Sequence, residues 1–299
     1  MTQHRIIPGF LALCLLWTLA VAVLPALAER PVDETRPLDP GGTLEISNVA
    51  GSVTVLGGSG QVEITGTLGD DVEELEIEGD GSHLEIRVKT PRNTRSDMDI
   101  DSHLTIRAPN GALLEVQTVS ASIAVEDLDE RLELQSVSGE IRAESRPRVL
   151  TVQTVSGEIH TTGASERAEV QSVSSLIELG EISGRIQAST VSGGIRVTGG
   201  SLDEAELSSV SGDIEVTTDL PAGAELHISN HSGDTILKLG GGASASFDVT
   251  TFSGDIDNQL GPPAERTSKY APGKSLEFSV GGGSARVEIE SFSGQVILK

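Results

Sequence analysis

The chain has 299 residues, of which 45 are acidic and 21 are basic, so its formal net charge at pH 7 is −24. A field of this sign excludes nucleic acid and anionic lipid as partners recognised through net charge, and it favours cations or basic partners. The chain holds one cysteine, Cys14, in an N-terminal apolar segment. No disulfide framework can therefore hold the rest of the chain together.

The first 28 residues have the pattern of a secretory signal peptide. An apolar run from Phe10 to Leu24 follows a weakly basic start, and Ala26-Leu27-Ala28 supplies the small residues of a cleavage site. A retained membrane anchor is the alternative, although the run is short for a bilayer span. We expect a periplasmic, secreted or cell-surface protein with no membrane insertion after signal cleavage.

The segment after the signal peptide divides into two parts. Residues 29–41 contain three prolines and mixed charges, which predicts an extended linker. Residues 42–108 hold a degenerate repeat around Val49 and several short alternating runs. Two of these runs, Leu75–Ile77 and Leu84–Val88, flank a Gly-Asp-Gly-Ser sequence that is typical of a hairpin. We expect an N-terminal coil and irregular antiparallel strands that cap it.

Residues 109–299 are dominated by one recurring motif, of which Ser136-Val137-Ser138-Gly139-Glu140-Ile141 is typical. Its central residue, here called position 0, recurs mostly at intervals of 18 to 21 residues, which is the signature of a repeat architecture. With Val49, the copies are centred on Val119, Val137, Val155, Val173, Val191, Val210, His231, Phe252 and, 40 residues later, Phe292.

Each copy of the motif predicts two half-buried strands. Apolar residues occupy positions −5 and −3 before the centre and positions +4 and +6 after it. Because the buried parity changes between the two strands, a corner must lie between them. We assign it to the Ser-Gly pair, since glycine adopts positive φ and serine can bond the local backbone. The predicted corner residues are Ser138, Gly139, Ser156, Gly157, Ser192, Gly193, Ser211, Gly212, Ser253, Gly254, Ser293 and Gly294.

The repeat length predicts the architecture. Eighteen residues at about 3.3 Å each form a circuit of about 60 Å, which suits one turn of a solenoid. We predict an all-β fold: a single-stranded parallel β-helix (β-solenoid) of about ten turns of 18–21 residues, with an irregular antiparallel N-terminal region. A β-sandwich is the alternative, and the strict self-similarity argues against it. Identical positions should stack into an isoleucine core column, an outward glutamine ladder and a buried hydroxyl column at position −1.

Two features near the C-terminus depart from the regular repeat. Residues 260–276 are rich in proline and glycine and include the basic residues Arg266, Lys269 and Lys274. This insertion is either a tolerated surface loop or a contact loop. The chain ends at Lys299 directly after a repeat strand, so we expect an open edge over Ser291–Lys299 through which copies could self-associate.

The sequence offers no set of residues for catalysis, cofactor binding or metal binding. The serines recur in every turn, unlike a unique nucleophile, and His227 and His231 lack a third ligand. Acidic residues at position +3 predict an acidic surface ridge, which is either a solvated face or a weak divalent-cation site. These residues are Glu140, Glu158, Asp213, Asp234 and Asp255.

The recurrent Ser/Thr-Val-Ser-Gly-Glu/Asp-Ile units resemble a bacterial exported family of β-strand repeat proteins named "putative adhesin", a domain of unknown function. The resemblance covers Gly42 to Lys299, includes the Pro-x-Gly-Ala turns at Pro109 and Pro221, and departs at Ser175-Leu176 and Thr235. It implies a non-enzymatic adhesin, scaffold or interaction module of the cell envelope, whose partner is an envelope protein or a glycan.

The alternative function is a polysaccharide-binding or polysaccharide-cleaving β-helix. Cleavage requires a unique pair of carboxyl groups, whereas the acidic residues here are spread evenly along the repeats. Aromatic residues make up only 2% of the chain, which leaves few rings for sugar stacking. We therefore favour the non-enzymatic interpretation.

Overall fold

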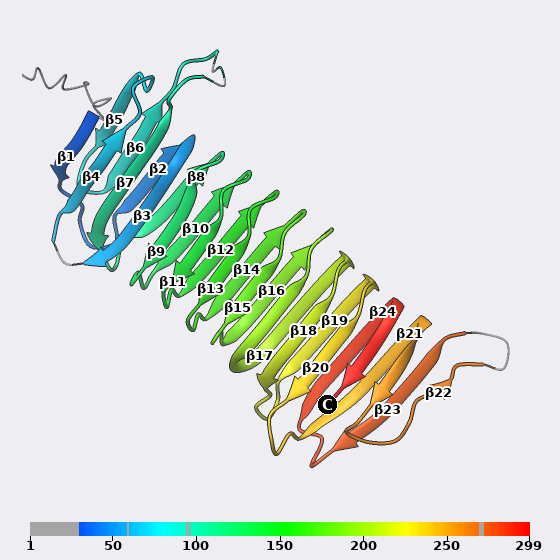
Figure 1. Ribbon diagram of the computed structural model, residues 1–299. Coiled ribbons are helices and arrows are strands. Elements are labelled where there is room, and N and C mark those ends of the chain that lie inside the picture. The colour runs from blue at the N-terminus through cyan, green and yellow to red at the C-terminus, as the bar shows by residue number, and fades with distance from the viewer. Residues whose placement is uncertain (1–29, 59, 94, 96, 269–271) are drawn as a thin grey trace, which may run out of the picture.

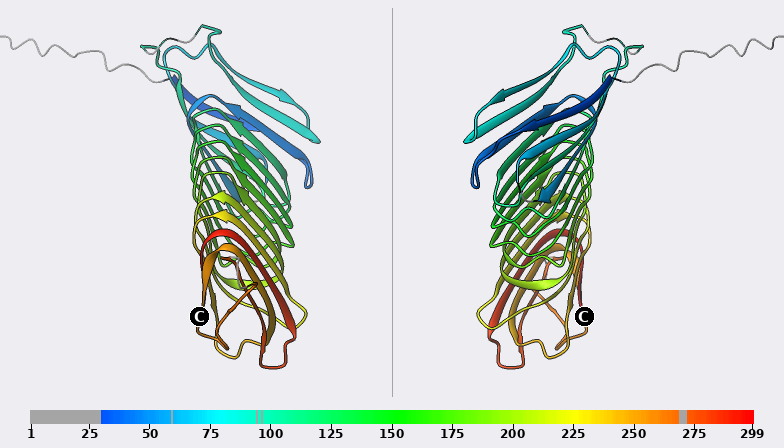
Figure 2. Two further views of the ribbon diagram at one scale, coloured as in Figure 1. Left: turned by 90° about the vertical axis from the view of Figure 1, so that its right-hand side faces the viewer. Right: turned by 90° about the vertical axis from the view of Figure 1, so that its left-hand side faces the viewer.

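The computed structural model describes residues 30–299 except 59, 94, 96 and 269–271. The predicted signal peptide lies outside the described residues. The described part of the chain forms 24 strands of one continuous hydrogen-bonded network and contains no helix that could span a membrane. The strands stack side by side along an elongated rod (Figure 1). The network coils so that two sheets face each other (Figure 2).

The regular repeats form turns with two strands each. The first strands pair in parallel one repeat apart, so that Leu132 lies between Leu114 and Leu150. The second strands do the same, with Ile141 between Ile123 and Ile159. First strands are β8 (Leu113–Thr118), β10 (Arg131–Ser136), β12 (Val149–Thr154), β14 (Arg167–Ser172) and β16 (Gly184–Thr190). Second strands are β9 (Ser122–Glu126), β11 (Ile141–Glu144), β13 (Ile159–Thr162) and β15 (Ile177–Gly180).

The next turns stay parallel, with register shifts between Gly184 and Arg185 and between Thr198 and Ser201. The strand β17 (Ile195–Ser211) passes through a corner and contributes to both sheets, and Gly199 and Gly200 take positive φ there. It is followed by β18 (Ile214–Asp219), β19 (Glu225–Ser232) and β20 (Thr235–Leu239). The predicted parallel β-solenoid is confirmed, and its turns form a flattened coil (Figure 2).

Aliphatic columns fill the space between the two sheets. The predicted core column of Ile123, Ile141, Ile159, Ile177, Ile195 and Ile214 is fully buried. The hydroxyls at position −1 are also buried and bond the corner backbone. Thr118 Oγ1 donates to the Ala121 carbonyl at 2.9 Å, and the Gly139 N–H donates to Ser136 Oγ at 2.8 Å. These bonds compensate the burial of Thr118 and Ser136, as predicted, whereas Thr190 Oγ1 and Ser291 Oγ in the same column have no hydrogen-bond partner within the described part of the chain.

The outward glutamine column differs from the predicted amide ladder. Gln117, Gln135 and Gln171 stack in register, but each Nε2 donates to the glutamate two residues earlier in its own strand, at 2.6–2.9 Å. A carboxylate is a stronger acceptor than a neighbouring amide. The glutamates therefore draw the amides along the strand and away from the next turn.

The corner begins at the central residue, one residue before the predicted Ser-Gly pair, and continues through that pair. Positions 0 and +1, such as Val137 and Ser138, are both exposed, whereas Gly139 at position +2 is buried. Two successive outward residues change the buried parity, so the corner starts at the Val-Ser pair. Ser138 Oγ donates to the Val119 carbonyl of the preceding turn at 3.2 Å, which ties successive corners together.

The reason for glycine at position +2 also differs from the prediction. Among the predicted corner glycines, only Gly294 takes positive φ, so backbone conformation does not explain the others. A Cβ on Gly157 would lie 1.9 Å from the carbonyl oxygen of Gly139, and the other copies have similar neighbours. The constraint is the close approach of two backbones in consecutive turns.

The N-terminal region extends both sheets beyond the first turn. Val53 in the first turn pairs in parallel with Leu104 on one side and with Ile123 on the other, and antiparallel strands follow at the outer edge. The hairpin between residues 79 and 83 joins two of these strands. The strands are β2 (Thr43–Asn48), β3 (Ala50–Gly58), β4 (Val62–Leu68), β5 (Glu74–Gly79), β6 (His83–Lys89) and β7 (Asp101–Pro109).

The predicted linker is wrong for most of its length. Residues Arg30–Arg36 form β1, which pairs with β4 in antiparallel register from Arg30 opposite Leu68 to Arg36 opposite Val62. The outer edge of β4 offers unpaired N–H and C=O groups, and β1 satisfies them. The half-buried Val32 packs against the core and adds apolar contact.

The C-terminal strand lies inside the stack. The last strands are β21 (Ala245–Asn258), β22 (Glu265–Arg266), β23 (Lys274–Val280) and β24 (Ala285–Leu298). Ser291 in β24 pairs with Asn230 on one side and with Thr251 on the other, and Val296 pairs with Thr235 and Ile256. The predicted open edge over Ser291–Lys299 is therefore wrong.

A chain reversal explains this order. The segment predicted as a loop contains β22 and the start of β23, and β23 runs antiparallel along the outer side of β21. The chain then turns through Gly281 to Gly283 and enters parallel to β21 on its inner side. The spatial order of position 0 is consequently His231, Phe292, Phe252. The ring of Phe278 stacks on Phe247 at 4.6 Å and covers the first half of the final turn.

We predict that Gly157→Ala lowers the free energy of unfolding by about 1–3 kcal/mol, the typical effect of overpacking, because the new Cβ meets the Gly139 carbonyl. Gly111→Ala is the matched control, since that position has no atom within 4 Å of a new Cβ. Denaturant unfolding measures both variants. Equal midpoints for the two would show that backbone approach does not select glycine.

Removal of Ser291–Lys299 should destabilise the last turns by about 3–6 kcal/mol, because it deletes the fully buried Val296 and Leu298, whose burial contributes about 1.5–3 kcal/mol each, and frees two strand edges. Thermal melts by circular dichroism and size-exclusion chromatography would record a lower midpoint and self-association of the truncated chain. An unchanged melt and a monomeric peak would contradict the inserted position of β24.

Candidate functional site

An exposed apolar stripe runs along the rod at position 0. Valine is typical of protein cores, but the central valines are 43–51% exposed, and the phenylalanines are exposed as well. Every exposed large hydrophobic side chain in the described part of the chain belongs to this column. The stripe consists of Val119, Val137, Val155, Val173, Val191, Val210, Phe292 and Phe252, with His231 between Val210 and Phe292.

The stripe follows from the geometry of the corner. Position −1 points inward and is held by its hydroxyl bonds, as Ser136 shows by accepting from the Gly139 N–H. Position 0 must then point outward, and position +1 bonds the preceding turn. The signal was present in the sequence, because a buried position −1 implies an exposed position 0. It was missed because valine is a residue typical of cores.

A groove runs beside the stripe over the buried hydroxyls. Its apolar wall is the stripe, and its polar wall is position −2. Its first half is lined by Gln117, Gln135, Gln153, Gln171, Ser189, Val137, Val155, Val173 and Val191 over Thr118, Ser136, Thr154 and Ser172. Its second half is lined by Ser208, Ser229, Thr250, Glu290, Val210, His231, Phe292 and Phe252 over Thr190, Ser209, Asn230, Thr251 and Ser291. At about 4.8 Å per turn the groove is about 40 Å long.

Three rings form the C-terminal end of the stripe. His231 stacks on Phe292 with ring centroids 4.6 Å apart, and Phe292 stacks on Phe252 at 4.7 Å. Face-to-face stacking is not the preferred arrangement of isolated rings, so the strand register imposes it. The inner faces of the rings cover one another. The outer face of Phe252 and the ring edges remain for a ligand, and Phe252 is 63% exposed.

Acidic side chains without basic partners accompany the groove. Glu115, Glu133 and Glu169 lie at position −4, and Glu290 lies on the polar wall beside Phe292. None of these four carboxylates has an ion-pair partner within the described part of the chain, although the first three accept bonds from glutamine amides. The face around the stripe therefore carries uncompensated negative charge.

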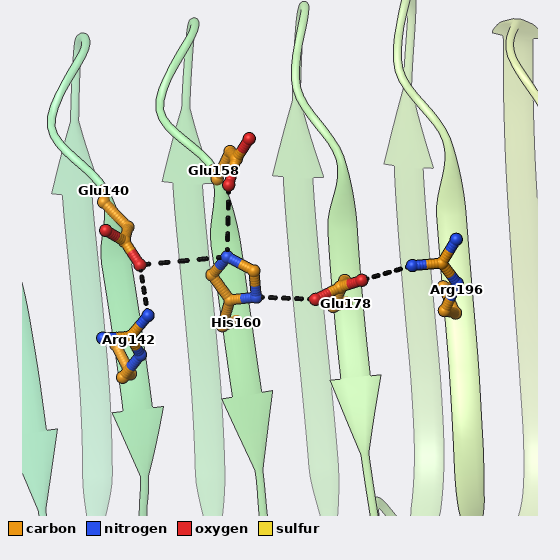
Figure 3. A network of polar contacts seen from close by, with 6 residues as sticks. All are labelled: Glu140, Arg142, Glu158, His160, Glu178 and Arg196. Carbon is orange, nitrogen blue, oxygen red and sulfur yellow. Dashed lines mark hydrogen bonds and ion pairs between the residues drawn. The ribbon is translucent and has the colours of Figure 1, made fainter.

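The predicted acidic ridge lies on the other sheet, and its first two members contact histidine or arginine side chains at position +5. His160 Nδ1 lies 2.8 Å from Glu178, and its Nε2 lies 3.4 Å from Glu158 and 3.8 Å from Glu140 (Figure 3). Arg142 bonds Glu140 at 2.5 Å, and Arg196 lies at the far end of the same network (Figure 3). The alternation of acids and bases between turns cancels the repulsion that stacked carboxylates would have.

The other three ridge residues are held by backbone groups and a lysine. Asp213 Oδ1 accepts from the Asp234 N–H at 2.8 Å, and Asp234 Oδ1 accepts from the Gln295 N–H at 2.9 Å. Asp255 bonds the Ile256 N–H at 2.7 Å and pairs with Lys274. These carboxylates act as caps between turns.

The ridge residues do not converge on one point. Leu176, Gly194 and Gln295 occupy position +3 in the intervening turns. The described residues contain no group of three or more metal-ligating side chains that could hold a metal ion. His227 and His231 also make different contacts. The His227 side chain lies 3.9 Å from the Glu288 carboxylate, whereas the His231 ring stacks on Phe292 in the stripe.

The ion pair between Asp255 and Lys274 makes the stability of this part of the ridge depend on pH. The Lys274 ammonium, and secondly the Ile256 N–H, lower the pKa of Asp255 below its usual value. A lowered folded-state pKa stabilises the fold above the unfolded aspartate value of about 3.9, and the contribution is lost as pH falls through the lowered value. Lys274 belongs to the predicted insertion, so this part of it contacts its own final turn.

We predict that Lys274→Met raises the pKa of Asp255 toward its usual value and removes this pH-dependent stabilisation. The melting difference between wild type and variant should be present at pH 7 and should vanish as the pH falls well below 4. Carboxyl NMR titration measures the pKa directly. An Asp255 pKa that stays lowered in the variant would show that the backbone N–H alone accounts for the shift.

The chain is similar to solved structures of other bacterial proteins. One is a "putative lipid binding protein" from Parabacteroides distasonis ATCC 8503, with a TM-score of 0.52 at 14% identity over 90% of this chain and 97% of that chain. Another is a "putative adhesin" from Bacteroides fragilis NCTC 9343, with a TM-score of 0.46 at 12% identity over 91% and 99% of the two chains. At these identities the likeness concerns the fold alone. No curated protein matches the chain.

The sequence profile of the Toastrack DUF4097 family matches residues 42–299, which span every turn of the solenoid. This agrees with the resemblance to a "putative adhesin" family of unknown function that the repeat motif indicates. The chain belongs to the Toastrack DUF4097 family.

Proposed function

We propose that the protein is a non-enzymatic, exported interaction module of the bacterial cell envelope, similar in role to an adhesin, that binds a partner macromolecule along the groove. The observation that carries this proposal is the stripe of exposed valines and phenylalanines. Contiguous exposed apolar surface is unfavourable in water, and on soluble proteins it marks interaction sites. The adhesin names of proteins with related folds support the same direction.

The chemistry of the groove supports binding and not catalysis. Its residues repeat from turn to turn, and Thr118 and Ser136 on its floor are engaged in bonds within the corner. A catalytic site needs a unique cluster whose pKa values are shifted for its task. The only lowered carboxyl pKa values in the described residues belong to exposed ion pairs and to a turn aspartate, Asp80.

The export and envelope location rest on the N-terminal segment. The basic start, the apolar run from Phe10 to Leu24 and the Ala-Leu-Ala sequence support cleavage and a periplasmic, secreted or cell-surface protein. A net charge of −24 would keep such a rod soluble and away from anionic membranes.

A polysaccharide ligand is the second candidate, and the ring end of the groove favours it. Phe252 lines the groove together with Glu290, Thr250 and Ser291, which offer the mixed apolar and polar contacts that sugars require. A glycan array with the mature protein and a reducing-sugar assay test binding and cleavage. Stripe-dependent binding of one glycan class would establish this candidate, and release of reducing ends would overturn the non-enzymatic assignment.

The proposed function predicts a partner contact at the stripe in cells. A photo-crosslinking amino acid at Val155 should yield an adduct of defined mass in cells that produce the full chain. Thr162, exposed at the opposite corner of the same turn, is the control position and should yield none. Protease or glycosidase sensitivity then identifies the class of the partner. Equal adduct formation at both positions, or at neither, would contradict the proposal.

A further inference from the structure

The shape and charge of the groove indicate which kind of molecule it binds. Resting on the proposed function, we propose that the groove binds a basic amphipathic α-helix of a partner protein, with the apolar face of the helix on the stripe and its lysines or arginines over the flanking carboxylates.

The shape of the stripe favours a helix. The stripe is one side chain wide and steps by about 4.8 Å per turn, whereas alternate side chains of an extended strand step by about 6.6 Å. An amphipathic helix places apolar residues at i, i+3, i+4 and i+7 in a narrow line that advances about 5.4 Å per turn. A groove about 40 Å long accommodates a helix of about 25 residues. Helix-in-groove recognition uses this arrangement of anchors.

The charge of the flanks favours a basic partner. Glu115, Glu133 and Glu169 lie four residues from the stripe in their strands, about 13 Å along the sheet, and Glu290 is nearer, at position −2. Asp213 and Asp234 lie three residues beyond the stripe on the other side. A helix about 10–12 Å in diameter carries lysine and arginine side chains long enough to reach these rows. Basic residues of the same sheet, such as Arg131 and Arg167, lie two residues further from the stripe.

The same features weigh against other occupants. A second copy of the chain would bring two bodies of charge −24 together. An anionic membrane would be repelled for the same reason. An acyl chain needs apolar walls on all sides, but one wall of this groove is made of glutamine, serine, threonine and glutamate. A glycan would use ring faces, and six of the stripe positions are valine while the stacked rings cover one another.

The test uses the mature full chain and a fluorescein-labelled synthetic peptide of 25 residues. The peptide carries leucines at i, i+3, i+4 and i+7 and lysines on both flanks. We expect micromolar binding by anisotropy that weakens as salt rises. Because the described part of the chain contains no helix, a gain of signal at 222 nm on mixing reports helix formation by the peptide. A scrambled peptide of the same composition and a version with glutamate in place of lysine should each bind at least tenfold more weakly.

Protein variants locate the contact. Val155→Ser with Val173→Ser should weaken the peptide at least tenfold without changing the melting temperature, since both side chains are exposed. Glu133→Gln with Glu169→Gln should weaken it about threefold and flatten its salt dependence. Thr162→Ser with Glu144→Gln, exposed at the opposite corner, are the matched controls and should leave binding unchanged.

Three results would reject the proposal that the groove binds a helix. Equal binding of the scrambled peptide, full affinity in the valine variants, or no binding at 100 µM peptide each reject it. Soluble linear polysaccharides and phosphatidylglycerol vesicles are tested in parallel, and stripe-dependent binding of either in place of the peptide also rejects it. An adduct at Val155 in cells together with failure of the peptide would reject the helix and leave the proposed function standing, whereas absence of the adduct rejects the proposed function itself.

Discussion

Parallel pairing of each turn with the next is the constraint on which the rest of this structure depends. It places every residue beside its counterpart one repeat earlier, so that Leu132 lies between Leu114 and Leu150 and Ile141 between Ile123 and Ile159. A single turn cannot bury its apolar side chains, and stacking converts the half-buried faces of all turns into one core. The backbone spacing of about 4.8 Å then limits what can occupy each column.

The same register explains the requirements at the corner. At position +2 two backbones approach so closely that a Cβ on Gly157 would meet the Gly139 carbonyl at 1.9 Å, and glycine is favoured there although its φ is ordinary. At position −1 a small hydroxyl satisfies the inward-facing corner backbone. At position +3 stacked carboxylates would repel one another, and the structure relieves this with His160, with arginines and with backbone N–H groups. The residue type at each of these positions of the motif is thus set by a contact with the next turn.

Position 0 is the exception, because nothing in the stack requires its side chain to be apolar. A residue that points outward at the corner could be polar without disturbing the core, yet the described turns carry valine or phenylalanine there in all but one of the copies from Val119 to Phe252. Apolar surface retained over about 40 Å, flanked by glutamates without basic partners, has no evident role in folding. A partner that covers it, as we propose, would supply the missing physical reason.

The two ends of the rod show how the stack is closed. At the N-terminal end, β1, β4 and β5 pair in antiparallel fashion, so the outermost strands differ in direction from the parallel turns. At the C-terminal end, β23 covers the first half of β21. The insertion of β24 between earlier turns hides the last residues of the chain, so sequence order and spatial order differ there. Edge strands that are short or covered discourage unwanted pairing with other chains.

The sequence by itself determined the repeat, the two strands per turn, the isoleucine column and the buried hydroxyls, because these depend on local alternation and on a period that any stacked turn must keep. It did not determine that Arg30–Arg36 forms an edge strand or that β24 enters the stack, since both depend on which distant edge offers free backbone groups. Only the tertiary structure decided that glycine marks a close backbone contact and that the central valines face solvent. A valine in the sequence looks the same whether it faces the core or the solvent. The direction of its side chain is set by the corner, whose conformation is held by hydrogen bonds to the neighbouring turn.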